Sequence, residues 1–185
     1  MTSDHYIKIG KQTALVTSLI GTGIFCIYFQ TDSFALLVWG YIFILLAGII
    51  NLGIFISILL KAYKDKNNRK HLLTTGGIML LNIPLAMIYF LGVSFLLDTM
   101  RITFTNATQE TLTDINITGC STKHIDKLEP GHNKTVWVGI SGDCTIAIDY
   151  LQNKARKEAS VMGYVTVSMG QKIKYNIGGR NDELF

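Results

Sequence analysis

Four side chains that could ligate a metal or take part in acid–base chemistry lie close together in the C-terminal half of the chain: His124, Asp126, His132 and Asp143. A zinc site needs three or four such ligands to converge on one point. Their spacing matches no HExxH, paired-cysteine or calcium-loop pattern, and no Gly-x-Ser-x-Gly turn accompanies them. We therefore expect no catalytic residue, no metal site and no cofactor, and we interpret these four residues as solvated loop positions.

Cysteine is the other residue type with possible chemistry. Cys26 lies in an apolar segment, whereas Cys120 and Cys144 lie in the polar C-terminal half of the chain. A bridge between the last two would close a loop of about 25 residues, and such bridges persist in oxidising compartments. The alternative is a pair of reduced, buried thiols. We favour the disulfide, because the topology derived below places both cysteines outside the cytoplasm.

The first hundred residues contain three apolar segments, 13–29, 34–60 and 72–97, none of which contains a charged residue. A helix rises about 1.5 Å per residue, so about 20 residues cross a hydrocarbon core that is about 30 Å thick. The rest of the chain is too small to bury three such helices. The segments are therefore predicted to be transmembrane helices.

The chain accordingly divides into parts with different composition. Residues 1–100 are predicted to form the transmembrane region. Residues 101–178, with nearly balanced charge, are predicted to form an extracytoplasmic domain, and residues 179–185 a C-terminal tail.

Basic residues orient the predicted helices, because short loops rich in Lys and Arg stay in the cytoplasm. The loop 61–70, "KAYKDKNNRK", separates the second and third apolar segments, whereas the link between the first and second carries no basic residue. The residues on which this orientation depends are Lys61, Lys64, Lys66, Arg69 and Lys70. The N-terminus and this loop are thus predicted to be cytoplasmic, and residues 100–185 extracytoplasmic, in a bacterial inner membrane.

A few residues inside the apolar segments are candidates for helix packing or for a hinge: Gly21, Asn51, Gly53, Asn82 and Pro84. Small residues let helices approach closely, and a proline kinks a helix because it lacks the backbone donor. Asn82 is expected to satisfy the backbone group that Pro84 frees, or to bond to Asn51. The small residues either pack the three helices on each other or form an interface with another subunit.

From residue 101 onward the apolar residues recur with a period of two, which is typical of β-strands. Ile146, Ile148 and Tyr150 share one strand face in this pattern. A bulge is expected near Asp114, and the polar stretch 152–158 is expected to be a turn. About seven short strands separated by turns predict an all-β domain built as a two-sheet sandwich.

The stretch "LEPGHNKTVWV", residues 128–138, contains a Leu-x-Pro-Gly turn that leads into a strand. It resembles the corresponding turn of bacterial immunoglobulin-like domains. The resemblance implies an immunoglobulin-like sandwich and carries no implication about activity.

The predicted function is non-enzymatic: an accessory or sensor subunit, embedded in membrane lipid, whose outer domain contacts a protein partner or a second copy of the chain. Trp137 and Tyr164 are the candidate contact residues, because exposed aromatic side chains often dominate interfaces. An alternative is an oligomeric channel or transporter subunit lined by Asn51, Asn82 and Pro84. A nucleic-acid partner is not expected, because much of the net charge of +4 comes from the N-terminal tail and the 61–70 loop.

Overall fold

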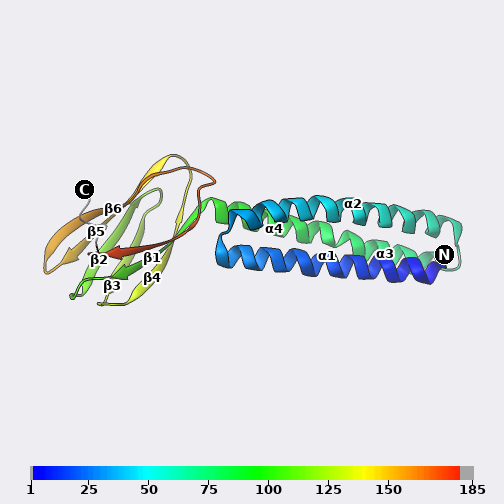
Figure 1. Cartoon of the computed structure of the whole chain (residues 1–185), viewed down its shortest axis with the longest axis horizontal. Coiled ribbons are helices and arrows are strands. Elements are labelled where there is room, and N and C mark those ends of the chain that lie inside the picture. Colours follow the sequence, from blue (N-terminus) through cyan, green and yellow to red (C-terminus); the bar gives the residue numbers. More distant parts are fainter. Residues whose placement is uncertain (1, 180–185) are drawn as a thin grey trace. The chain divides into compact units, whose positions relative to one another are not determined.

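The computed structural model describes residues 2–179 and divides into two compact units, Met1–Val93 and Ser94–Phe185 (Figure 1). The first unit is helical. The second contains the last turn of the final helix and all of the strands. Of the predicted tail, Gly179 is described, and residues 180–185 lie outside the described part of the chain.

The helices are α1 (Ser3–Thr31), α2 (Phe34–Lys64), α3 (Arg69–Leu80) and α4 (Asn82–Leu97). They make three stretches that are long and apolar enough to cross a membrane, of 29, 31 and 29 residues, with α3 and α4 forming the third. At about 1.5 Å per residue each exceeds 40 Å in length. Helix α1 begins ten residues before the apolar segment 13–29, because residues 3–12 continue the helix and pack against its neighbours.

The third stretch is interrupted at Leu81, as Pro84 predicts. Proline has no backbone N–H, and its ring clashes with the carbonyl four residues earlier, which here belongs to Leu80. The N–H of Leu81 donates to the carbonyl oxygen of Ile78, three residues earlier, at 3.2 Å. This turn is tighter than an α-helical turn and ends α3. Helix α4 then starts afresh at Asn82.

The core of the helical unit lies where α1, α2 and α3 meet, and it consists of Ala14, Ile58, Ala62, Leu72 and Met79. Gly10 allows this close approach. A Cβ atom at that position would lie 2.6 Å from Cδ1 of Ile58 and 2.7 Å from Cγ2 of Thr75. Sequence analysis did not single out Gly10, because it precedes the first apolar segment.

Seven strands follow α4: β1 (Thr99–Asn106), β2 (Leu112–Gly119), β3 (Lys123–Leu128), β4 (Asn133–Gly139), β5 (Cys144–Gln152), β6 (Ala155–Val165) and β7 (Lys172–Ile177). They form two sheets, one with the order β4-β1-β7 and the other with the order β3-β2-β5-β6. Strands β1 and β7 are parallel, and the other pairs are antiparallel.

The inner faces of the two sheets share one hydrophobic core, so the unit is a sandwich. Ile102 and Phe104 contribute to it from β1, and Ile146, Ile148 and Tyr150 from β5. All five side chains are buried. The alternation predicted for these strands is confirmed.

Two irregularities shape the β3-β2-β5-β6 sheet. Asp114 has a φ of 50° at a register shift between β2 and β5, so the predicted bulge is confirmed. The turn predicted over 152–158 is present but shorter than expected. The turn consists only of Asn153 and Lys154, whose φ values of 51° and 65° suit a tight two-residue hairpin. Residues 155–158 are polar because they lie in the edge strand β6 and are exposed to solvent.

Candidate functional site

An apolar groove lies in the helical unit beside the break at Leu81. Its volume is about 640 Å³, and its walls come from α1, α2, the end of α3 and the first half of α4. Aliphatic side chains make up much of these walls, and five aromatic residues join them: Tyr41, Phe43, Phe55, Tyr89 and Phe90. A groove of this size and polarity suits an apolar molecule or another apolar helix.

Two asparagine amides and one hydroxyl form a polar cluster on the wall of this groove. Asn82 Nδ2 donates to Thr17 Oγ1 at 3.0 Å and to the carbonyl oxygen of Ala14 at 3.2 Å. Asn51 Nδ2 approaches the same hydroxyl at 3.4 Å and donates to the carbonyl oxygen of Ala47 at 2.8 Å. The prediction of a direct bond between the two asparagines was therefore wrong. Both amides instead reach the hydroxyl of Thr17.

The amide oxygen of Asn51 is the unusual atom of the cluster. It is buried and, within residues 2–179, has no hydrogen-bond partner. An unsatisfied buried acceptor is costly, so this atom suits a donor supplied from outside the helical unit. None of the described residues that line the groove is Asp, Glu, His, Lys or Arg.

The other residues predicted for helix packing or a hinge have different surroundings. Gly21 lies on the groove wall, where an added Cβ would meet the ring of Tyr89 at 3.4 Å. A Cβ at Gly53 would meet nothing within 4 Å, so this glycine faces open space. Pro84 marks the helix break and is not among the groove residues.

The basic loop is held by an acid that sequence analysis did not consider. Lys61 and Lys64 lie in the last turn of α2, and Arg69 and Lys70 begin α3. Between them the Asp65 carboxylate accepts hydrogen bonds from the Ser3 hydroxyl and from the side chain of Asn68, the latter at 3.0 Å. These bonds, with that of Ser3 the strongest cause, lower the pKa of Asp65 to about 2. The start of α1 is thus tied to the loop.

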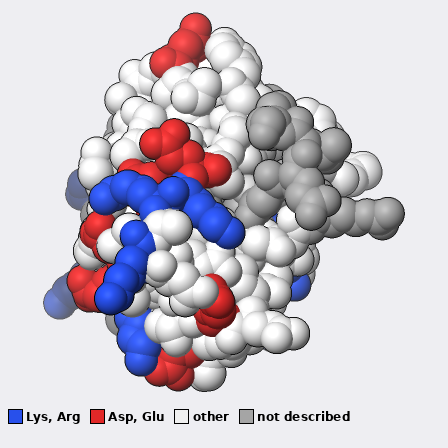
Figure 2. Space-filling view, turned by 90° about the vertical axis from the view of Figure 1, so that its left-hand side faces the viewer, with Lys and Arg blue, Asp and Glu red and all other residues white. Residues whose placement is uncertain are grey.

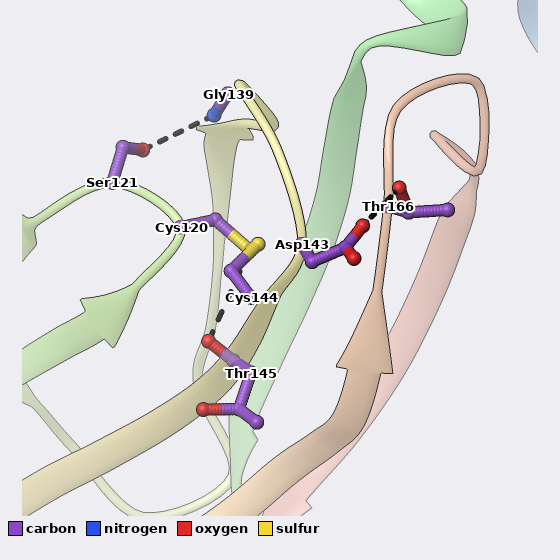
Figure 3. The surroundings of a disulfide bond; sticks show 7 residues. All are labelled: Cys120, Ser121, Gly139, Asp143, Cys144, Thr145 and Thr166. Carbon is purple, nitrogen blue, oxygen red and sulfur yellow. Dashed lines mark hydrogen bonds between the residues drawn. A yellow bond between two sulfur atoms is a disulfide. The ribbon is translucent and has the colours of Figure 1, made fainter.

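Cys120 and Cys144 form a disulfide (Figure 3). Cys120 follows β2 and Cys144 begins β5, which are neighbours in one sheet, and their Cα atoms are 5.2 Å apart. The prediction of a bridge is confirmed, and the alternative of two reduced thiols is excluded. The Oγ atom of Ser121 accepts a bond from the N–H of Gly139 at 3.1 Å, which ties this end of β2 to β4.

The four residues predicted to be solvated loop positions fall into three places, and the prediction of a loop was wrong for His124 and Asp126, which lie in strand β3. His124 Nδ1 lies 2.8 Å from Asn116 Oδ1, and His124 Nε2 lies 3.2 Å from a carboxylate oxygen of Asp126. His132 lies in the turn before β4, and Asp143 lies beside the disulfide. Across residues 2–179 there is no group of three or more His, Cys, Asp or Glu side chains that could hold a metal ion.

Next to His124, Arg156 of β6 pairs with Asp149 and Asp114 on the solvent face of the same sheet. Burial acts to raise the pKa of Asp149, but hydrogen bonds from Asn116 and Arg156 outweigh it and leave that pKa below its usual value. Figure 2 shows acidic and basic side chains interspersed over part of the surface it presents. These mixed charges are typical of a solvated surface.

The two candidate contact aromatics belong to different sheets. Trp137 lies on β4, with its ring centroid 6.0 Å from that of Phe95 and 5.7 Å from the guanidinium carbon of Arg101. Its exposed fraction is 38 %. Tyr164 lies on β6, and 58 % of it is exposed. The two residues therefore present separate surfaces.

Comparisons of the chain with family models, with curated proteins and with solved structures found no match.

Proposed function

We propose that the chain is a non-enzymatic integral membrane subunit that crosses a bacterial inner membrane three times and presents the sandwich outside the cytoplasm. Each helical stretch is longer than the roughly 30 Å that a hydrocarbon core requires. Most of the large apolar side chains of α1, α2 and α4 are exposed, which suits contact with lipid. Charged residues gather at the ends of these stretches.

The orientation rests on two independent features. The loop between α2 and α3 holds the basic residues that favour the cytoplasmic side. The sandwich holds the disulfide, which favours an oxidising compartment. With three crossings, a cytoplasmic N-terminus and an extracytoplasmic sandwich are mutually consistent.

The sandwich is proposed to be immunoglobulin-like in the broad sense. It has seven strands in two sheets, as such domains do. The orders β3-β2-β5-β6 and β4-β1-β7 differ from the ABED and CFG sheets of immunoglobulin constant domains, and the disulfide joins neighbouring strands of one sheet instead of bridging two sheets. The likeness is therefore one of architecture.

The role that this arrangement supports best is that of an accessory or sensor subunit whose outer domain contacts a protein. The observation that carries it is the junction: a disulfide-bonded sandwich begins at Thr99, and only Asp98 separates it from the end of α4 at Leu97. So short a link presents a folded module close to a bilayer. Tyr164, exposed on the edge strand β6, is the contact residue that we assign to a protein partner or a second copy of the chain.

Labelling in intact cells tests the topology. Cysteine introduced by Ala155→Cys, in a Cys26→Ala background, should react with a membrane-impermeant maleimide before lysis. The matched variant Lys66→Cys, in the basic loop, should react only after lysis. If position 155 is protected until lysis, the proposed location of the sandwich is wrong.

Photo-crosslinking in native membranes tests the contact. A photoreactive residue at position 164 should give one discrete adduct, with a different protein or with the chain itself. The matched position Lys174, exposed on β7 of the other sheet, should not give that adduct. The same pattern from both positions, or no adduct from either, would refute a specific contact at Tyr164.

A second candidate function is a channel or transporter subunit, which the groove and the unsatisfied oxygen of Asn51 favour. Protein in liposomes should then pass solute, and Asn82→Leu should abolish the flux. Ser57→Leu is the matched control, because Ser57 bonds only to the carbonyl of Gly53 within its own helix. Absence of flux in the unaltered protein would remove this candidate.

A further inference from the structure

The loop between β6 and β7, residues 166–171, is hydrogen-bonded to the residue before β5 and to the end of α4. The hydroxyl of Thr166 donates to Asp143 at 2.6 Å, as Figure 3 shows. The N–H of Ser168 donates to Asp98 Oδ1 at 3.0 Å. The N–H of Gly170 donates to the carbonyl oxygen of Leu97 at 2.6 Å. The loop therefore has a fixed position at the junction between helix and sandwich.

Gly170 is required for this contact. A Cβ atom there would lie 2.3 Å from the carbonyl oxygen of Leu96 and 2.4 Å from that of Leu97. Such distances are far below van der Waals contact. Only glycine lets the loop lie directly on the last helical turn.

The side chains that this loop presents are apolar although they are exposed. Val167 is 48 % exposed and Met169 is 40 % exposed. Trp137, beside Phe95 of the last helical turn, adds an aromatic ring to the same end of the sandwich. Two acids at this end, Asp98 and Asp143, accept the hydrogen bonds that hold the loop.

The length of the third helical stretch, α3 together with α4, sets the depth of this end in a bilayer. No residue between His71 and Asp98 is charged, and that stretch spans about 39 Å at 1.5 Å per residue. A hydrocarbon core of about 30 Å then leaves each end roughly 5 Å beyond its edge, in the headgroup layer. Residues bonded directly to Leu97 and Asp98 must lie at a similar depth. Tryptophan is enriched at that depth in membrane proteins.

We propose that residues 166–171, together with Trp137, form a lipid-contact surface that lies in the headgroup layer of the outer leaflet. The surface rests on the proposed membrane topology, and it assigns Trp137 to lipid and not to a protein partner. Burial of Val167 and Met169 among lipid fixes the end of the sandwich to the bilayer in addition to the covalent link through Asp98.

Quenching of tryptophan fluorescence by brominated phosphatidylcholine tests this surface in the full chain, reconstituted in liposomes. Three single-tryptophan proteins are compared. One carries Met169→Trp and another Gln109→Trp, each with both native tryptophans replaced by Phe, and the third keeps only Trp39 of α2. Gln109 follows the far end of β1, a strand of eight residues and so about 26 Å long.

The tryptophan at position 169 should have blue-shifted emission and should lose intensity in brominated lipid as Trp39 does, while that at position 109 should lose none. Val167→Trp provides an independent measurement on the same loop, should the change at position 169 disturb folding. If Trp39 is quenched while positions 167 and 169 behave like position 109, the lipid-contact surface is refuted and the membrane topology stands. If Trp39 is not quenched either, the proposed topology fails with it.

Discussion

Removing the disulfide should destabilise the sandwich strongly, and the structure allows the size of the effect to be estimated. The bridge joins residues 24 apart in sequence and closes a loop that contains β3 and β4. In the chain-entropy account, a loop of this length contributes about 3 kcal/mol at 25 °C, by restricting the unfolded chain. For a domain of 60–100 residues, that loss corresponds to a fall in Tm of about 12–24 °C.

The change to make is Cys120→Ala with Cys144→Ala, in the full chain and in a Trp39→Phe background, so that Trp137 alone reports thermal unfolding of the sandwich. Cys26→Ala is the matched control, because Cys26 is the free cysteine of α1 and is exposed. A reductant should lower the Tm of the parent protein and leave that of the double variant unchanged. If the double variant melts at the same temperature as the parent, the bridge does not contribute the stability calculated here, and the reasoning from loop closure is wrong for this domain.

Three further predictions concern the carboxylate of Asp65, the contact at Gly170 and the hydroxyl of Thr17. The pKa of Asp65 in the folded protein, about 2, lies below the ordinary value of 3.8, so the hydrogen bonds to its carboxylate stabilise the fold fully above pH 4 and are lost as the pH falls towards 2. Ser3→Ala should raise this pKa towards its ordinary value, as measured by an NMR titration of the carboxyl carbon. Gly170→Ala should destabilise the sandwich by about 1–3 kcal/mol, measured by thermal unfolding, because the added Cβ clashes with the end of α4. Gly142→Ala is the control and should leave the stability unchanged, because no atom lies within 4 Å of its added Cβ. Thr17→Val removes the hydroxyl that both asparagine amides share and should cost about 1 kcal/mol, measured by unfolding in mixed micelles, since hydrogen bonds between membrane helices average about 0.6 kcal/mol each.

Local sequence determined the elements of the chain well. The three apolar segments predicted the helices, because a long continuous run of apolar residues has few stable conformations other than a helix. Pro84 located the helix break to within three residues, because its effect on the carbonyl of Leu80 depends only on covalent geometry. The period of two from residue 101 onward predicted the strands, and Asp114 the bulge. The polar stretch 152–158 misled because an exposed edge strand has the same composition as a turn.

Hydrogen bonds between side chains far apart in the sequence were beyond prediction from one sequence. Asn51 and Asn82 were recognised as unusual, yet their common partner, Thr17, is one of several hydroxyls in the first apolar segment. The bond between Ser3 and Asp65 spans 62 residues. Which hydroxyl meets which amide depends on helix rotation and crossing, and neither leaves a periodic signal in the sequence.

By itself the sequence determined the helical and β-rich parts and the break at Pro84, because each follows from the character of a short stretch. It also identified Cys120 and Cys144 as the candidates for a bridge, because they are the only cysteines outside the apolar segments. Only the tertiary structure decided the strand order, the groove beside the polar cluster and the position of residues 166–171 on the end of α4. Those features arise where elements far apart in the chain pack together, and a single hydrogen bond or a missing Cβ, as at Gly170, then determines which surface is left exposed.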